Sequence, residues 1–232
     1  MKTIQDIKNN WGNTEELQKA MHENMCELVD NDHELKLHRD FVQDNVFGFG
    51  ERSFWWAWKL ICAELPENPT LLEIGVFRSA TLSLWKLLRP DSKVFGITPL
   101  DTSGDMWESD YEADIKHIHD KFNLPQPFIF KGRSDNPEIV AAASSFLYDV
   151  VYIDGSHTFE DSLHDLNTYA RLVKEGGFLV VDDAASRFNM PFGYFTGIKE
   201  VCDALQTWEA SAGAKRFEFC FNVKHLMVYK RV

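Results

Sequence analysis

Cysteine, positive charge and long apolar runs are all scarce in this sequence. Its four cysteines are scattered, without a C-x-x-C pair or a histidine at zinc-finger spacing, so we expect reduced, mostly buried thiols rather than disulfides or a zinc finger. Lys and Arg total 24 against 36 Asp and Glu, a net charge of −12. Because this charge repels phosphate backbones and no Lys/Arg stripe offsets it, nucleic acid is not expected as a partner.

Membrane and export signals are also lacking. No stretch approaches the ~18 apolar residues that a membrane span needs, and the first residues have no apolar core of signal-peptide length. We therefore expect a cytoplasmic protein that acts on small molecules and has no membrane partner.

The composition itself is that of a folded domain. With 232 residues, 44% hydrophobic and 13% aromatic, the chain can bury a core of its own. We expect residues 1–50 to form a helical extension, a lid or an oligomer contact, ahead of the main domain at 51–232. Residues 14–28 predict a helix with Thr14 as N-cap and Leu17, Met21, Met25 and Leu28 on one face, which could pair with a second copy.

From Thr70 onward, short apolar runs alternate with helical patterns. The runs are 71–76, 93–97, 127–130, 148–154 and 178–183. Continuous apolar strands separated by helices indicate an α/β fold, an open doubly wound and mostly parallel sheet buried on both faces. Gly176 and Gly177 are expected to end the helix before the last of these strands. Residues 216–221 and 225–230 predict an antiparallel hairpin at one edge of the sheet.

Polar and small residues follow each predicted parallel strand, where ligands bind in open α/β sheets. They are Glu73 and Gly75, Thr98 and Asp101, Gly132 and Ser134, Asp154 and His157, and Asp182 and Asp183. A pyrophosphate-binding fingerprint needs further glycines where this chain has Phe77 and Ala80, so NAD is poorly supported.

Three aspartates, Asp154, Asp182 and Asp183, end two strands that can be neighbours. Carboxylates that converge cannot all stay ionised without compensation, and Mg²⁺, Mn²⁺ or Ca²⁺ would supply it. The alternative is that these aspartates cap turns and accept backbone hydrogen bonds. His157 has the chemistry of a general base, or is simply a neighbour of the next helix's N-cap.

Two histidines and three tryptophans are not expected to take part in the chemistry. His117 and His119 fall in an acidic stretch that we interpret as a solvated helix face without chemistry. Trp55, Trp56 and Trp58 are interpreted as core or subunit contacts.

Taken together, the strand ends resemble the class I S-adenosylmethionine-dependent methyltransferases, and within them the metal-dependent branch around macrocin O-methyltransferase and cephalosporin hydroxylase. The resemblance covers about residues 70–230 and is most specific over 148–184, YDVVYIDGSHTFEDSLHDLNTYARLVKEGGFLVVDDA. It implies a Rossmann-like methyltransferase fold, to which the terminal hairpin contributes the reversed edge strand.

The resemblance also implies roles for particular residues. Glu73 and Gly75, with Phe77 and Ser79 where the family commonly has glycines, would lie beside the methionine part and ribose of the cofactor. Thr98 or Asp101 would hold the ribose, and Gly132 and Ser134 would meet the adenine. Asp154, Asp182 and Asp183 would bind the divalent metal. Asp154 and His157 would be catalytic, with Asp154 also beside the cofactor and His157 as the base.

The resulting interpretation is O-methylation of a small hydroxylated acceptor, with Mg²⁺ as the expected metal. A metal that chelates two neighbouring oxygens would lower the pKa of the acceptor hydroxyl and align it with the methyl group. Substrate contacts are expected from the first 50 residues and from 186–196. Two alternatives stay open: a metal-dependent glycosyltransferase, and a non-catalytic binding subunit marked by the bulky first motif.

Overall fold

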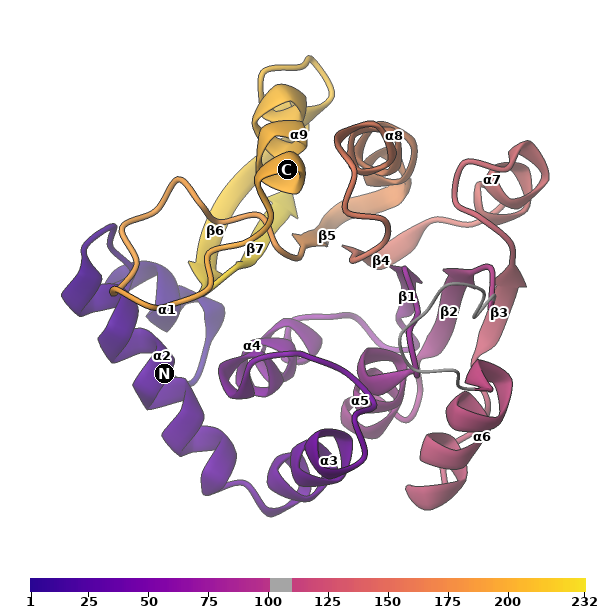
Figure 1. Cartoon of the computed structure of the whole chain (residues 1–232), viewed down its shortest axis with the longest axis horizontal. Helices are drawn as coiled ribbons and strands as arrows, with labels where there is room; N and C mark the ends of the chain where they lie inside the picture. Colours follow the sequence, from indigo (N-terminus) through magenta and orange to yellow (C-terminus); the bar gives the residue numbers. More distant parts are fainter. Residues whose placement is uncertain (101–109) are drawn as a thin grey trace.

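The computed structural model describes residues 1–100 and 110–232, and within them one seven-stranded sheet runs through the molecule (Figure 1). Its strand order is β3-β2-β1-β4-β5-β7-β6. All pairings are parallel except those of β7, which runs antiparallel to β5 and β6. The mostly parallel sheet with a C-terminal antiparallel hairpin is therefore confirmed. The strands are β1 (Thr70–Ile74), β2 (Lys93–Thr98), β3 (Phe128–Lys131), β4 (Tyr148–Ile153), β5 (Val173–Val181), β6 (Phe217–Val223) and β7 (Leu226–Arg231).

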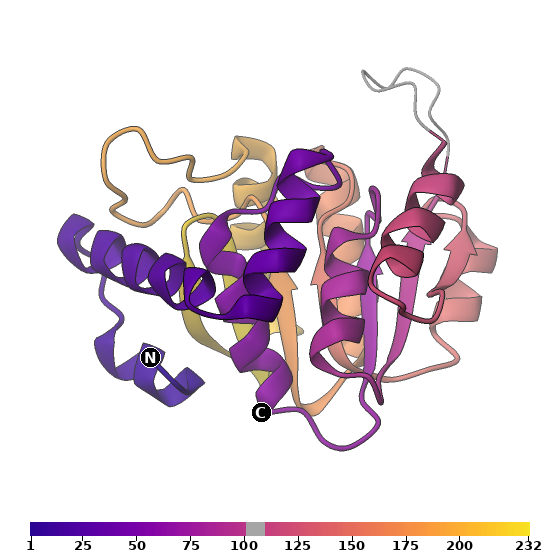
Figure 2. The same cartoon turned by 90° about the horizontal axis from the view of Figure 1, so that it is seen from below.

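Helices cover both faces of this sheet (Figures 1 and 2). One face carries the N-terminal helices together with those that follow β1 and β2: α1 (Ile4–Asn10), α2 (Glu15–Asp30), α3 (His33–Asp44), α4 (Arg52–Ala63), α5 (Ala80–Leu88) and α6 (Tyr111–Lys121). The other face carries α7 (Pro137–Ala143), α8 (Phe159–Tyr169) and α9 (Lys199–Glu209).

The apolar runs of the central strands are continuous because both sheet faces are covered. All six residues of β4 are buried, and they alternate between the two cores: Val150 packs with the N-terminal helices, whereas Val151 packs with α8 and α9. A strand covered in this way presents apolar side chains to both faces over most of its length.

The expected helix end at Gly176 and Gly177 is wrong. Helix α8 ends at Tyr169, a short 3-10 turn covers Ala170–Leu172, and the chain has already entered β5 at Val173. Gly176 has a φ of +78°, and the β4–β5 register shifts between Tyr148 and Val150. The glycines thus accommodate an irregular strand entry, not a helix cap.

The N-terminal helix begins as predicted but turns a different face inward. The Thr14 side chain caps α2 through the Leu17 amide. The buried residues of α2 are Gln18, Met21, Met25 and Val29, whereas Leu17 is 44% exposed. Gln18 is drawn inside because its side chain bonds with buried Asn222 of β6. The two methionines lie in the same core as α4 and β6, within this chain.

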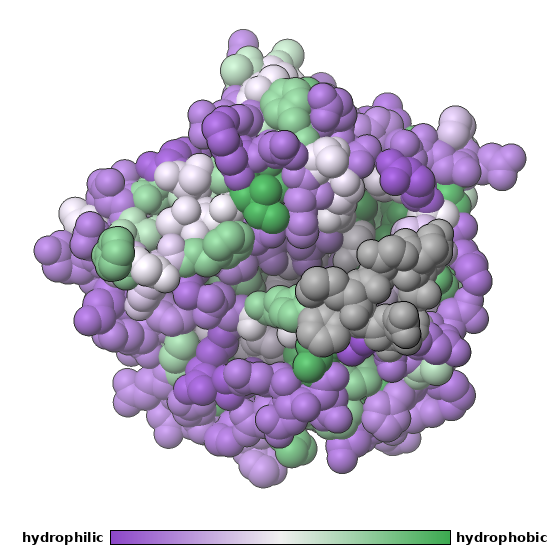
Figure 3. Space-filling model, in the orientation of Figure 1, coloured by the Kyte–Doolittle hydropathy of each residue, from purple (hydrophilic) through white to green (hydrophobic). Residues whose placement is uncertain are grey.

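The surface is mainly polar on the side seen in Figure 1. Figure 3 shows hydrophobic side chains there in separate groups within a largely hydrophilic face. Among the described residues, no helix has the length and apolar character needed to cross a membrane.

Candidate active site

The strand order places a cavity where the chain changes direction in the sheet. Strands β1 and β4 are neighbours, but the chain leaves β1 through α5 toward β2 and leaves β4 through α8 toward β5. Open α/β sheets bind ligands where the connections diverge in this way. A cavity of about 340 Å³ opens there, at the carboxyl ends of β1, β4 and β5. The sequence-predicted residues that line it are Glu73, Gly75, Phe77, Ser79, Asp154, His157, Asp182 and Asp183.

Gly75 is required by the packing of β1 against β4. Its φ is +92°, and a Cβ atom built on it would lie 1.9 Å from the carbonyl oxygen of Asp154. A side chain is therefore excluded both by the backbone conformation and by the neighbouring chain. The bare turn leaves room for a ligand to approach the backbone.

Glu73, at the end of β1, is a buried acid with spare hydrogen-bonding capacity. Glu73 is 4% exposed, and its Oε2 atom has no hydrogen-bond partner among the described residues. Burial raises its pKa well above the ordinary value, and the charge of Asp154 adds to that rise. A buried oxygen without a partner at a cavity wall is typical of a group that meets a ligand.

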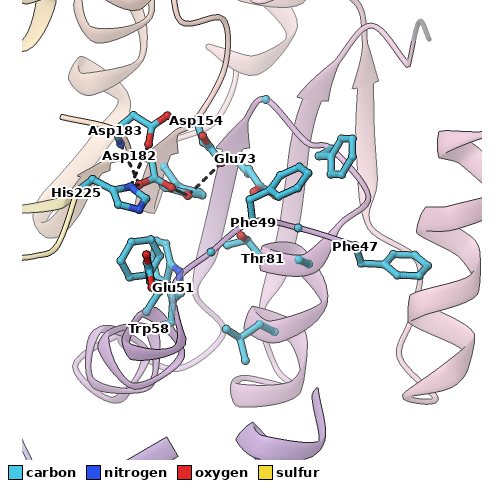
Figure 4. A pocket seen from close by; sticks show the side chains of 18 of the residues that line it. Phe47, Phe49, Glu51, Trp58, Glu73, Thr81, Asp154, Asp182, Asp183 and His225 are labelled. Atoms are coloured by element: carbon cyan, nitrogen blue, oxygen red, sulfur yellow. Dashed lines mark hydrogen bonds and ion pairs between the residues drawn. The ribbon is translucent and has the colours of Figure 1, made fainter. Parts of the chain in front are cut away.

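An acid cluster, defined here as Asp154, Asp182, Asp183 and His225, lies at one end of the cavity. Figure 4 shows these side chains together, with Glu73 between them and Phe49 in that view. His225 Nδ1 lies 2.7 Å from Asp182 Oδ1 and 3.0 Å from Asp183 Oδ1. The hydroxyl of Tyr152 donates to Asp182 Oδ2 at 2.6 Å.

His157 stands at the edge of this cluster. Its Nε2 atom is 3.3 Å from Asp183 Oδ2 and 4.0 Å from Asp154 Oδ1, and its side chain is 48% exposed. The nearby carboxylate of Asp154 raises the pKa of His157, although partial burial opposes the rise. A histidine so placed can take a proton and have its charge stabilised by two carboxylates.

Charge compensation in the cluster is internal. Burial alone would lower the pKa of His225, but its bonds to Asp182 and Asp183 outweigh that effect and raise it to about 10. Against the effect of its own burial, the bond from His225 lowers the pKa of Asp182. Burial and the charge of Asp182 raise the pKa of Asp154, and nearby His157 offsets only part of that rise. The imidazolium of His225 therefore supplies part of the positive charge that three carboxylates require.

The donor atoms of the cluster also fit a divalent cation. Asp182, Asp183 and His225 each offer a ligand atom, and these atoms lie within 4.8 Å of one another. Asp154 and Asp183 are more open to the cavity than Asp182, with side-chain exposures of 33% and 14%. Carboxylate oxygens suit Mg²⁺ or Mn²⁺, whereas His225 would become a ligand only after its imidazolium loses a proton.

Three predicted cofactor residues lie along the same sheet edge but outside the described lining of this cavity. The Thr98 carbonyl accepts from the Gly132 amide at 3.0 Å, which joins the ends of β2 and β3. The Ser134 carbonyl accepts from the Tyr169 hydroxyl at 2.7 Å. Asp101 lies outside the described residues.

Several lining residues were missed by sequence reasoning. They include Glu51, Tyr152 and His225, whereas 47–50 and Phe195 line the cavity within the two regions from which substrate contacts are expected. The rings of Phe54 and Phe195 lie 4.9 and 5.0 Å from His225. One signal could have found His225: an antiparallel strand begins at the edge where its parallel neighbours end, so the first residues of β7 meet the last residues of β5. Trp55 and Trp58 are buried as predicted, and they also line the cavity.

The interpretation of His119 as part of a solvated face is wrong. His117 is exposed as expected, but His119 is fully buried and contacts Ser79. The acidic residues cover only the outer side of α6, whereas Ile115, Ile118 and His119 face inward. Local charge density thus misses the helix periodicity that turns this histidine toward the cavity wall.

The family of the chain follows from its sequence match. Residues 72–184, which span Glu73 to Asp183, match the family model described as a methyltransferase domain. Over these residues, just under half of the chain, the sequence is similar to a methyltransferase domain. Domains of this class use S-adenosylmethionine, as the resemblance of the strand ends implied.

One relative shares the methyltransferase-domain region at the sequence level. An uncharacterized protein of Acanthamoeba polyphaga mimivirus is 30% identical over 151 residues, which cover 62% of this chain and 64% of the relative. The match thus spans about two thirds of the relative's length.

Solved structures agree with the methyltransferase domain in fold. A Staphylococcus aureus protein assigned as a caffeoyl-CoA O-methyltransferase superimposes with a TM-score of 0.64 at 16% identity, over 90% of this chain and 99% of that one. MycE methyltransferase of the mycinamycin biosynthetic pathway, solved with Mg and SAH, gives a TM-score of 0.53 at 16% identity, over 80% and 50%. At these identities the likeness establishes the fold.

Proposed function

We propose that this methyltransferase domain transfers the methyl group of S-adenosylmethionine to a hydroxyl of a small acceptor, with a divalent cation at the acid cluster. One observation carries the proposal: the Gly75 turn and the acid cluster open onto the same cavity. A methyl donor on the turn would therefore face an acceptor held beside His157.

The cofactor side is formed by the end of β1 and the start of α5. Glu73 Oε2, buried and without a partner among the described residues, would accept a hydrogen bond from the cofactor. Gly75 leaves the backbone open to it, and Phe77 and Ser79 form the rest of the turn. The adenosine would extend along the edge toward Thr98, Gly132 and Ser134, and either Thr98 or Asp101 would hold its ribose.

The acceptor side is formed by the acid cluster and His157. Asp154, Asp182 and Asp183 would hold the cation, whose charge lowers the pKa of a nearby hydroxyl. His157 Nε2 takes the proton of the acceptor hydroxyl, and Asp154 and Asp183 stabilise the imidazolium that results. The acceptor oxygen then bonds to the methyl carbon as the carbon–sulfur bond breaks, which leaves S-adenosylhomocysteine.

The acceptor we propose is a small hydroxylated molecule, not a nucleic acid. The chain carries a net charge of −12, which disfavours a polyanionic substrate. Phe47, Phe49 and Phe195 line the cavity and offer apolar contact beside the acidic end. We also propose a cytoplasmic location, in keeping with four free cysteines, and residues 1–50 as a lid or a contact in a homo-oligomer.

Calorimetry with S-adenosylmethionine, S-adenosylhomocysteine and a uridine diphosphate sugar tests the cofactor. We expect both adenosyl compounds to bind. Heat from the nucleotide sugar alone would instead favour a glycosyltransferase.

The metal is tested separately from the cofactor. We expect Mn²⁺ to bind the wild type, as measured by electron paramagnetic resonance, and to bind Asp183→Asn much more weakly. Asp44→Asn, at an exposed position of α3, is the matched control. Methyl transfer to a panel of catechols and sugars should stop with a chelator and return with Mg²⁺. Full turnover after chelation would overturn the metal requirement.

A further inference from the structure

Ser79 adopts a backbone conformation that its side chain does not favour. It has φ 70° and ψ 26°, in the left-handed region where glycine is the usual residue. It is also the N-cap of α5, yet its hydroxyl makes no capping bond. The hydroxyl is therefore available to bond with a group outside the helix, and such a bond can stabilise the left-handed conformation.

His119 is the partner of that hydroxyl. Ser79 Oγ lies 3.0 Å from His119 Nε2, and His119 Nδ1 lies 2.7 Å from the carbonyl oxygen of Pro125. A carbonyl only accepts, so Nδ1 carries the hydrogen, and Nε2 of the neutral ring accepts from Ser79. Both side chains are at most 1% exposed, so water does not compete for the bond. Burial lowers the pKa of His119, which favours the neutral ring.

A second buried histidine fixes the same helix turn from another side. His38 Nδ1 accepts from Trp55 Nε1 at 2.9 Å, so its Nε2 donates to Ser83 Oγ at 2.9 Å. Ser83 in turn donates to the Ala80 carbonyl at 2.9 Å. The first turn of α5 is thus held by α6 through His119 and by α3 through His38.

We propose that His119 is a positioning residue for the cofactor: it holds Ser79 in the left-handed conformation and so fixes the turn that lines the cavity. Ser79, Ala80 and Thr81 all line that cavity, whereas His119 is not among its described lining residues. The proposal rests on the proposed function, because it assumes that S-adenosylmethionine binds at this turn.

The test is a double-mutant cycle read by calorimetry with S-adenosylmethionine. We expect His119→Leu and Ser79→Ala each to weaken binding about tenfold, since each removes a buried hydrogen bond. His119→Gln should stay close to wild type because its Oε1 atom can accept in place of Nε2. Ser79→Gly provides the reference background, since glycine takes a positive φ unaided. In that glycine background, adding His119→Leu should change the Kd no further.

Three outcomes would decide against the inference. An unchanged Kd in folded His119→Leu, with only a lower unfolding temperature, would make the histidine merely structural. A loss of affinity that persists in the Ser79→Gly background would show that His119 does not act through Ser79. A wild type that binds no S-adenosylmethionine would overturn the proposed function and this inference with it. His33→Leu, at an exposed position of α3, is the matched control.

Discussion

The two sides of the cavity use buried histidines in opposite protonation states. On the acid side, His225 is 6% exposed and is held as a cation between Asp182 and Asp183. On the cofactor side, His119 and His38 are fully buried and neutral, with a carbonyl, a hydroxyl and an indole as partners. Burial is similar on both sides, so the neighbouring groups decide the charge.

This difference separates the chemistry of the two sides. Carboxylates and imidazoles at the ends of β4, β5 and β7 can move a proton and hold a cation. The turn after β1 is held by the neutral Ser79–His119 bond and by the Arg78–Asp114 ion pair, and it adjoins one buried acid, Glu73. A charged cofactor and an acceptor hydroxyl would thus meet two environments within a single cavity.

The largest effect is expected from removing the base on the acid side. His157→Ala should lower kcat by ~10² to 10⁴, the range for losing a positioned general base. The Kd of S-adenosylmethionine should be unchanged, because His157 lies away from the turn. Single-turnover kinetics and calorimetry would measure the two quantities. Weaker binding of S-adenosylmethionine by His157→Ala would show that the two sides of the cavity do not act separately.

Next in size is the stability supplied by His225. His225→Leu should lower the free energy of unfolding by ~3–5 kcal/mol, because two acids lose their buried counter-charge. His119→Leu removes only neutral hydrogen bonds and should cost ~1–3 kcal/mol. Urea unfolding at pH 7 gives both values. Equal losses would contradict the assignment of opposite charge states.

The contributions of His225 and His38 to the free energy of unfolding should change with pH in opposite directions. The pKa of His225 is raised to about 10, so its contribution to stability is complete below its unfolded pKa of 6.5 and is lost as the pH rises toward 10. Burial lowers the pKa of His38 to about 3, so stability is lost as the pH falls below 6.5.

Each of these two pH-dependent contributions to the free energy of unfolding should amount to about 2–4 kcal/mol. Each should vanish in the matching variant, His225→Leu or His38→Gln. The measurement is unfolding by urea from pH 4.5 to 10, analysed as wild type minus variant. The difference is needed because Asp154 and Glu73, whose pKa values are raised, gain protons on folding over part of the same range. A variant whose free energy of unfolding varies with pH as in the wild type would contradict the protonation state assigned to that histidine.

The smallest effect concerns the far end of the cofactor side. If Asp101 holds the ribose, Asp101→Ala should weaken S-adenosylmethionine by ~1–3 kcal/mol while Thr98→Val has little effect. An unchanged Kd in Asp101→Ala with a weaker Thr98→Val would assign the contact to Thr98. Calorimetry on both variants separates the two cases.

Much of the fold was accessible from local pattern. Continuous apolar runs at 71–76 and 148–154 indicate strands covered on both faces, and the structure places them at the centre of the sheet. Thr14 and Thr158 cap their helices because a hydroxyl before a helix satisfies a free amide. Helices α1, α7 and α9 were not predicted. Two of them are seven residues long, which is too short for a clear period.

The sequence by itself determined that acids follow the predicted parallel strands, because strand ends and their polar residues are encoded locally. The tertiary structure alone decided which distant residues complete the site. His225 reaches Asp182 only because β7 runs antiparallel beside β5, and His119 reaches Ser79 only because α6 packs against α5. Contacts between such segments depend on strand order and helix packing, which no local period specifies. For the same reason, the charge of each histidine could not be assigned before its neighbours were known.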